Sequence, residues 1–202
     1  TAIFGTSLVF AGAYLLEKTQ GAGPVRSAVR LLAMLPMAVP GLVLGLGYIF
    51  FFNAPGNPLG GLYHTMALLT VCTIAHFYTT GHLTAVTALK ALDAEFEAVS
   101  ASLKVPWWVT LRRVTLPICT PAMIDIARYF FINAMTTISA VVFLYSPETK
   151  VASIAILNLD EAGEMGAAAA CAVLITAASS LAMLAFSVLA WLVDKKNQAW
   201  RT

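Results

Sequence analysis

The chain alternates between long apolar runs and short segments that contain charges or turn-forming residues. Residues 31–89 contain no Asp, Glu, Lys or Arg, whereas a single membrane-spanning helix needs only about 20 apolar residues. The pattern therefore predicts that this region crosses a membrane more than once.

Five apolar runs end at charges or at clusters of Gly, Pro and Asn. The predicted spans are about residues 1–17, 31–52, 62–89, 120–145 and 165–193. Pro36 and Pro40 fall inside the second span, and we expect them to kink it. The charge-free turn at residues 53–61 predicts a short hairpin to the third span. The expected fold is all-α, a polytopic bundle of membrane helices.

The composition agrees with an integral membrane protein. Hydrophobic residues make up 59% of the chain and charged residues 11%, with a mean hydropathy of +0.82, whereas soluble domains carry about 25% charged residues. A net charge of +2 gives no electrostatic footprint for nucleic acid. The sequence begins at Thr1, without a Met and already inside an apolar run, so we interpret it as a piece of a longer polypeptide. A signal peptide would need a basic stretch before its apolar core, and none is present.

Basic residues gather after the first, third and fifth spans, which predicts that these three segments and the C-terminus are cytoplasmic. They are Lys18, Arg26 and Arg30; Lys90, Lys104, Arg112 and Arg113; and Lys195, Lys196 and Arg201. The connection before the fifth span contains Glu148, Asp160, Glu161 and Glu164, and we expect it on the opposite side of the membrane.

No catalytic or phosphate-binding motif is present: the sequence contains no GxxxxGK[ST], HExxH or GxSxG pattern. Cys72, Cys119 and Cys171 lie far apart in or beside apolar runs, and we expect them to pack as small apolar residues. We therefore expect a non-catalytic chain that binds no cofactor of its own.

The three histidines are the candidates for a metal or proton-relay site. His76 and His82 are six positions apart, about 240° around a helix, and His64 lies near the outer turn. No carboxylate in that span could orient an imidazole. We expect no metal site, and we expect His76 to line a cavity or to pack in the bundle.

The fourth span has a polar stripe. Asp125, Tyr129, Asn133, Thr136 and Thr137 fall within an arc of about 120°, with Arg128 at its edge. Asp125 and Arg128 have the i, i+3 spacing of a helical ion pair. The stripe is compatible with hydrogen bonding between helices and with the lining of a translocation path.

The predicted cytoplasmic segment 90–117 has its own pattern, LDAEFEAVSASLKVPWWVTLRRVTLP from Leu92 onward. Apolar residues at helical spacing and early acidic residues predict a short amphipathic helix over residues 92–103. Pro106 ends it, and Trp107 begins a second short helix. Such a segment could lie on the membrane surface or dock a cytoplasmic partner.

This run resembles the EAA loop of the membrane subunits of binding-protein-dependent ABC importers. The matching residues are Leu92, Asp93, Glu97, Ser102, Leu103, Trp108, Arg113, Val114, Leu116 and Pro117. The departures are Ala98, Val99 and Ser100, which stand where Glu-Ala-Ala is usual, and Lys104, which replaces a Gly that permits a sharp turn.

The resemblance covers nearly all of residues 1–202, which it identifies as one transmembrane domain. LPMAVPGLVLGLGY is similar to the second span of the ferric-iron and polyamine branch. The run FFINAMTTISAVVFLYSPETKVASIAILNLDEAG and the ending NQAWR resemble 2-aminoethylphosphonate importer permeases.

The resemblance implies a permease subunit in the bacterial inner membrane whose segment 90–117 couples to a cytoplasmic ATPase dimer. That dimer would bind ATP and Mg. A periplasmic solute-binding protein and a second permease half, fused or separate, would complete the transporter. The implied solute is 2-aminoethylphosphonate, with Arg128 able to meet the phosphonate; ferric iron, a polyamine or a sulfate-like anion are alternatives.

Two other classes stay open on the sequence. A secondary transporter driven by protons or sodium would use Asp125 or His76 as its coupling group. A membrane enzyme or scaffold subunit would need a reactive cluster, and the residues do not assemble one.

Overall fold

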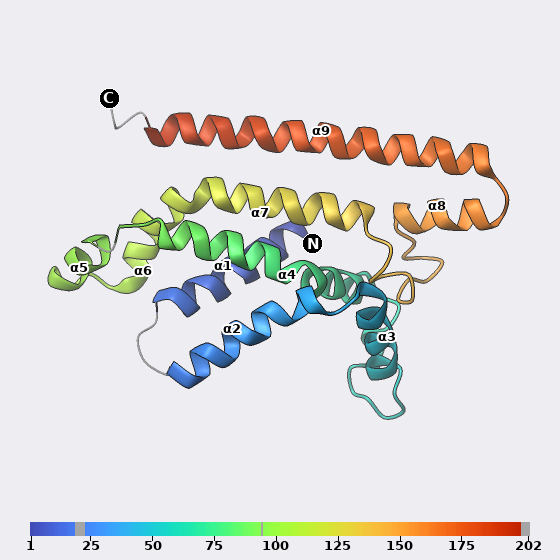
Figure 1. The fold of residues 1–202 in the computed structure, drawn as a ribbon, viewed down its shortest axis with the longest axis horizontal. Coiled ribbons are helices and arrows are strands. Elements are labelled where there is room, and N and C mark those ends of the chain that lie inside the picture. Colours follow the sequence, from blue (N-terminus) through green and yellow to red (C-terminus); the bar gives the residue numbers. More distant parts are fainter. Residues whose placement is uncertain (19–22, 94, 199–202) are drawn as a thin grey trace.

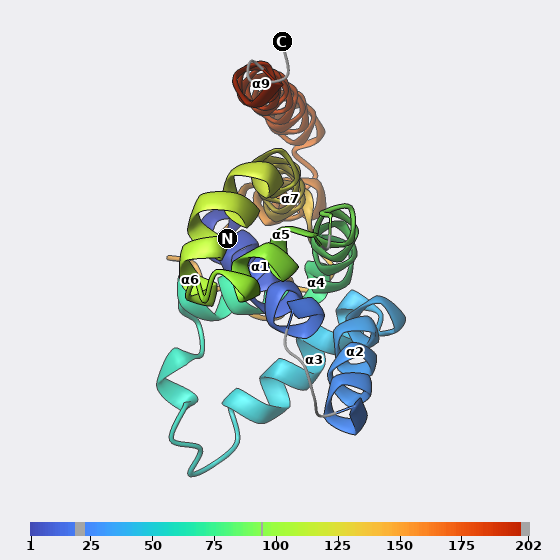
Figure 2. The same cartoon turned by 90° about the vertical axis from the view of Figure 1, so that its left-hand side faces the viewer.

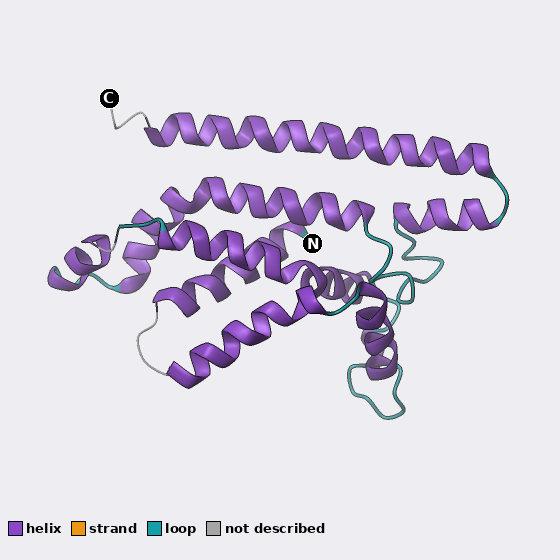
Figure 3. Cartoon of the chain, in the orientation of Figure 1, coloured by secondary structure: helices purple, strands orange, loops and turns teal. Residues whose placement is uncertain are grey.

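A computed structural model describes residues 1–18, 23–93 and 95–198. Within those residues all regular elements are helical, as Figure 3 shows. This confirms the predicted all-α class. Lys196 lies in a helix but its side chain is not among the described parts, and Arg201, a predicted cytoplasmic charge, lies outside the described residues.

Three helices form the centre of the bundle. Helices α1 (Ala2–Lys18), α4 (Met66–Lys90) and α7 (Leu116–Thr136) pack against one another, and α9 (Met165–Gln198) lies along the outer side of α7 (Figures 1 and 2). Their shared core contains Val9, Phe10, Ala13, Ala85, Leu89, Ile126 and Phe130. The apolar runs around α1, α4 and α7 thus become helices that each bury one face, whereas the membrane-length segment of α9 stays exposed.

The predicted second span, 31–52, is interrupted, and the interruption lies at one of the two prolines expected to kink it. It forms α2 (Gly23–Ala38) and α3 (Gly41–Phe52), which meet at an angle of 109°. Pro36 is tolerated inside α2, but the chain breaks at Pro40, the N-cap residue of α3. Proline has no amide hydrogen to donate, and it disfavours the helical conformation of the residue before it. A 3-10 turn (Gly60–Leu62) follows α3 before α4 begins.

The predicted fourth span, 120–145, is wrong as a helix beyond Thr136. Helix α7 ends there, Thr137 is extended (φ −71°, ψ 138°), and residues 137–151 form a loop. Ser153 Oγ donates a hydrogen bond to the Thr137 carbonyl oxygen at 2.7 Å. Thr136, Thr137 and Ile138 are β-branched and weak helix formers. The predicted outer connection then contains a helix that the sequence analysis missed, α8 (Ala152–Glu161).

The 137–151 loop folds back into the protein instead of lying on its surface. Its apolar residues join a second core cluster made of Leu68, Leu69, Cys72, Ala140, Val141, Leu144 and Ile154. Cys72 Sγ donates to the Ala140 carbonyl at 3.4 Å. The loop and α4 therefore share a buried interface.

Glycines let α3 approach this loop. A Cβ at Gly45 would lie 2.8 Å from the Ala140 carbonyl oxygen. At Gly41 a Cβ would lie 3.1 Å from Cε1 of His76 and closer still to the Ser139 hydroxyl. Gly41 and Gly45 of the second apolar run thus serve close packing.

Length and apolar composition mark Met165–Lys195, within α9, as able to cross a membrane alone, and α2 with α3 as a bent pair. The predicted spans 1–17 and 62–89 correspond to α1 and α4, and the helical part of 120–145 to α7. That these three cross the membrane stays a prediction, as do the sidedness and the total of five.

Packing of α3 against the 137–151 loop leaves no room for a side chain at position 45. We expect Gly45→Ala to lower the free energy of unfolding by about 1–3 kcal/mol, because the added methyl overpacks the Ala140 backbone. Gly47→Ala is the control: it lies in the same helix, and a Cβ there meets nothing within 4 Å. Thermal unfolding in detergent measures both variants. Equal midpoints would contradict the close approach of α3 and the loop.

Candidate functional site

The predicted coupling segment lies at one end of the bundle (Figure 1). The expected amphipathic helix is α5 (Glu95–Ser102), and the second short helix begins at Trp107 as α6 (Trp107–Thr110), with Pro106 as its N-cap. Pro117 does not end α6. A π-helical turn (Leu111–Thr115) joins it to α7, and the Leu116 amide bonds to the Leu111 carbonyl across that turn.

Lys104 occupies the position where a glycine is usual, and its backbone is left-handed with φ +53°. The Val105 amide donates to the Ser100 carbonyl at 2.9 Å, and the Lys104 amide donates to the Ala101 carbonyl at 3.1 Å. This is the Schellman arrangement that ends many helices, usually with glycine in the left-handed position. The sharp turn is kept although the glycine is absent.

Side-chain contacts hold the two short helices together. Thr110 Oγ1 donates to Ser100 Oγ at 3.0 Å, so a departure from the usual Glu-Ala-Ala sequence provides a link between α5 and α6. The Trp107 ring lies 6.4 Å from the Tyr14 ring of α1, centroid to centroid. The segment is thus attached to the bundle through α6.

Two adjacent residues at the end of α1 connect it to separate elements. Lys18 forms an ion pair with Glu97 of α5. Glu17, whose side chain is 9% exposed, accepts from Arg30 Nη2 at 2.8 Å and lies 3.4 Å from Arg26 Nη2, both on α2. Sequence reasoning missed these pairs because their members lie far apart in the chain, and no spacing rule joins them.

The apolar stripe of α5 faces outward. Phe96 is 45% exposed, Val99 55% and Leu103 69%. Within the described residues this stripe has no cover, although exposed apolar surface of this kind marks interaction sites or membrane contact. Arg113 is exposed, and Leu92 and Leu116 are partly buried where the segment meets the bundle.

The polar stripe of α7 is only partly available to a solute. Asp125 and Arg128 form the predicted ion pair at 2.9 Å, and Arg128 Nη1 donates to Ser187 Oγ of α9 at 3.4 Å. Asn133 Nδ2 donates to the Tyr129 carbonyl at 2.8 Å. Thr136 donates to a carbonyl of its own helix, and Thr137 is buried at the start of the loop.

Tyr129 is the member of the stripe that lines a hollow at the break between α2 and α3. This polar hollow has a volume of about 390 Å³. Helices α2, α3, α4 and α7 contribute its lining, which includes Pro36, Met37, Pro40, Gly41, His76, Phe77, Thr79, Thr80 and Tyr129. The cavity-lining prediction for His76 therefore agrees with its position here.

Two features shape the wall of the polar hollow. The Thr79 hydroxyl donates to the Ala33 carbonyl of α2 at 2.8 Å, and the Phe77 and Tyr129 rings meet edge to face at 5.8 Å. The Nδ1 atom of His76 is enclosed and has no hydrogen-bond partner among the described residues.

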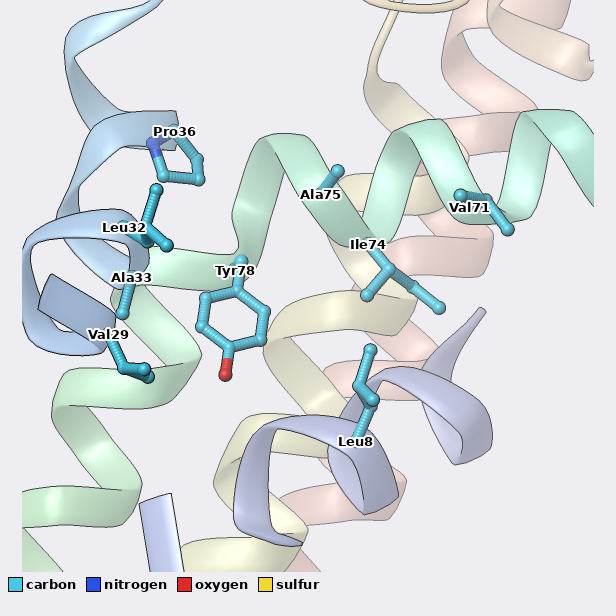
Figure 4. Close-up of a pocket in the computed structure, with 9 residues that line it drawn as sticks. All are labelled: Leu8, Val29, Leu32, Ala33, Pro36, Val71, Ile74, Ala75 and Tyr78. Atoms are coloured by element: carbon cyan, nitrogen blue, oxygen red, sulfur yellow. The ribbon is translucent and has the colours of Figure 1, made fainter. Parts of the chain in front are cut away.

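A neighbouring hollow of about 380 Å³ differs in chemistry. Figure 4 shows Leu8 of α1, Val29, Leu32 and Pro36 of α2, and Ile74 and Tyr78 of α4 around it. Its wall is almost wholly apolar, apart from the Tyr78 hydroxyl. Such a surface suits hydrocarbon, not a polar solute.

Residues 9–195 match the model of a family described as the binding-protein-dependent transport system inner membrane component. The chain belongs to this family. It is thus an inner membrane component of a binding-protein-dependent transport system, which confirms the family that segment 90–117 resembled.

Relatives in the family are named for different solutes. The chain is 34% identical over 170 residues to the ferric transport system permease protein FbpB of Actinobacillus pleuropneumoniae, covering 84% of this chain and 23% of that protein. It is 29% identical over 153 residues to a protein of Salmonella paratyphi A named as the 2-aminoethylphosphonate transport system permease PhnV, covering 74% and 56%. The chain thus spans about a quarter of the length of the FbpB protein and about half of the length of the PhnV protein.

The left-handed Lys104 gives a test of the turn in the coupling segment. We expect Lys104→Gly to stabilise the turn by about 1 kcal/mol, because glycine removes the Cβ penalty. Hydrogen exchange of the α5 amides should slow by about fivefold. Lys104→Ala is the matched control, since it removes the charge but keeps the Cβ. Equal protection in both variants would show that the charge, and not the backbone, governs this turn.

Proposed function

We propose that this chain forms one half of the membrane path of an ATP-driven importer and has no catalytic activity of its own. A dimer of cytoplasmic ATPase subunits binds the 90–117 segment and supplies ATP hydrolysis with Mg. A second permease half, fused or separate, completes the path. The C-terminus is cytoplasmic.

The observation that carries this proposal is the exposed apolar stripe of α5, formed by Phe96, Val99 and Leu103. A stripe held by rigid contacts at one end of the bundle suits a partner with an apolar groove, the mode in which a short helix binds a groove. The Schellman turn at Lys104 and the Ser100–Thr110 hydrogen bond give α5 a fixed orientation. Family membership supports the same role.

At the opposite end of the bundle, the solute-binding protein would approach the connection around α8. Glu148, Asp160, Glu161 and Glu164 are candidate contacts there. Glu161 and Glu164 are exposed, so they are available for electrostatic steering of a partner.

For the solute we propose 2-aminoethylphosphonate. The resemblance of residues 130–163 to permeases of that solute and the similarity to PhnV support this assignment. Ferric iron is the second candidate, because the FbpB relative is 34% identical over 170 residues. An oxyanion and a ferric ion need different ligand groups, so one site does not suit both. Uptake measured separately with each labelled solute distinguishes the two candidates.

Substitutions on α5 test the docking surface. We expect Leu103→Asp to weaken co-purification of the ATPase subunit by at least tenfold, because it puts a charge into an apolar contact. Ala101→Asp is the matched control. Ala101 is also exposed, but lies on the opposite face of α5 at about 100° per residue. Both variants should fold, because neither position is buried.

The same preparations, reconstituted in proteoliposomes with all subunits, test transport. The wild type should take up labelled 2-aminoethylphosphonate only with ATP, Ala101→Asp should match it, and Leu103→Asp should lose uptake. Equal ATPase recovery and uptake in the two variants would contradict docking through the stripe. Uptake that needs a proton or sodium gradient and no ATPase subunit would favour the secondary-transporter class.

A further inference from the structure

The polar hollow lies about halfway along two long helices of the bundle. His76 and Thr80 are near the middle of α4 (Met66–Lys90), and Tyr129 is near the middle of α7 (Leu116–Thr136). The α2–α3 break provides the remaining wall at Pro36–Gly41. Secondary transporters commonly bind solutes near the bilayer midplane where a helix is interrupted. The physical reason is general, because interrupted backbone at membrane depth is tolerated only where protein or a water-filled cavity encloses it.

We infer that the polar hollow is the site where the phosphonate head of the solute rests during its passage through this chain. The inference deepens the proposed function and depends on it. It places solute recognition on His76, Thr80 and Tyr129, and not on Arg128, which is engaged by Asp125 and Ser187.

An enclosed polar atom in the lining needs a partner. Nδ1 of His76 has no hydrogen-bond partner among the described residues, and its surroundings leave it less than 1 Å² of exposed surface. An unsatisfied buried polar group costs about 1–3 kcal/mol. This small surface closes Nδ1 off from the hollow, so the imidazole must turn before a ligand oxygen there can accept a hydrogen bond from Nδ1–H and relieve that cost.

The other polar groups of the lining are also donors. The Tyr129 hydroxyl and the exposed Thr80 hydroxyl can each donate to an oxyanion. Helix α3 starts at Gly41, so its positive end faces the same hollow and adds to the attraction for an anion. Three different helices therefore present groups suited to phosphonate oxygens.

The lining favours weak and reversible binding. Of the described residues that form it, none is Asp, Glu, Lys or Arg. Neutral donors hold an anion less tightly than an arginine clamp, and a transport site must also release its solute. Met37 and Phe77 provide apolar walls beside the donors, which suits the ethylene part of an aminoalkyl phosphonate.

The same lining suits a ferric ion poorly. His76 and Tyr129 are its side chains suited to ferric iron, since the Met37 thioether prefers softer metals, and oxygen-rich coordination would need further carboxylate or phenolate groups. The chemistry of this lining therefore supports an oxyanion over a ferric ion as its occupant.

The test measures solute moved per ATP hydrolysed, with the assembled transporter in proteoliposomes and 2-aminoethylphosphonate-loaded binding protein at saturation. We expect His76→Leu and Tyr129→Phe each to lower this ratio by about tenfold, the effect of one lost hydrogen bond to a charged group. Stimulated ATP hydrolysis should stay within twofold of wild type. His76→Asn, which can still donate near the Nδ1 position, should recover most of the ratio.

Tyr78→Phe is the control, because Tyr78 lies on the same helix but lines the neighbouring apolar hollow (Figure 4). Its ratio should match wild type. If wild type transports and all four variants transport equally, the inference is overturned while the proposed function stands. If both uptake and hydrolysis fall together in the His76 and Tyr129 variants, their role is structural and the inference is also overturned.

Failure of the proposed function gives a different result. In that case wild-type proteoliposomes accumulate no 2-aminoethylphosphonate under ATP hydrolysis. The wild type could instead take up ferric iron under ATP hydrolysis, and Tyr129→Phe could take it up equally well. This pair of results would overturn both the proposed solute and the site.

Discussion

Backbone that leaves a helix inside a membrane must have its amides and carbonyls enclosed by protein, and this constraint governs the structure. Two places where the chain leaves a helix within a predicted span lie against each other: the break between α2 and α3, and the start of the 137–151 loop. They meet where Gly41 approaches Ser139 and Gly45 approaches the Ala140 carbonyl. Because α3 turns away from α2 by 109° to reach the loop, a hollow remains at the break with His76 and Tyr129 in its wall.

The opposite end of the bundle is connected to this hollow through α1 and α2. Lys18 pairs with Glu97 of α5, and the adjacent Glu17 pairs with Arg30 of α2. Helix α2 then leads to the break at Pro40. The proposed ATPase-docking helix α5 and the proposed solute site are thus joined through α1 and α2 by these two ion pairs.

The sequence predicts much of this chain where local chemistry determines structure. Periodicity and spacing predict the helical class, the two short helices around Pro106 and the Asp125–Arg128 pair. The turn at Lys104 lies where the first of these short helices ends. The end of α7 and the helix α8 were not predictable in this way. Residues 137–145 are apolar enough to continue a helix. The β-branched residues Thr136, Thr137 and Ile138 weaken the helix there, and burial against α3 and α4 stabilises the loop. The Glu17 and Lys18 pairs depend on tertiary contact alone.

Accessibility of the polar hollow tests the account most directly. Thr80→Cys, in a background with Cys72, Cys119 and Cys171 replaced, puts a thiol on the wall of the hollow. In the assembled transporter, a membrane-impermeant thiol reagent should modify this cysteine, and saturating 2-aminoethylphosphonate during ATP turnover should slow the modification severalfold. A thiol that never reacts would contradict a solute path through the α2–α3 break. So would a rate of modification that is the same with and without 2-aminoethylphosphonate.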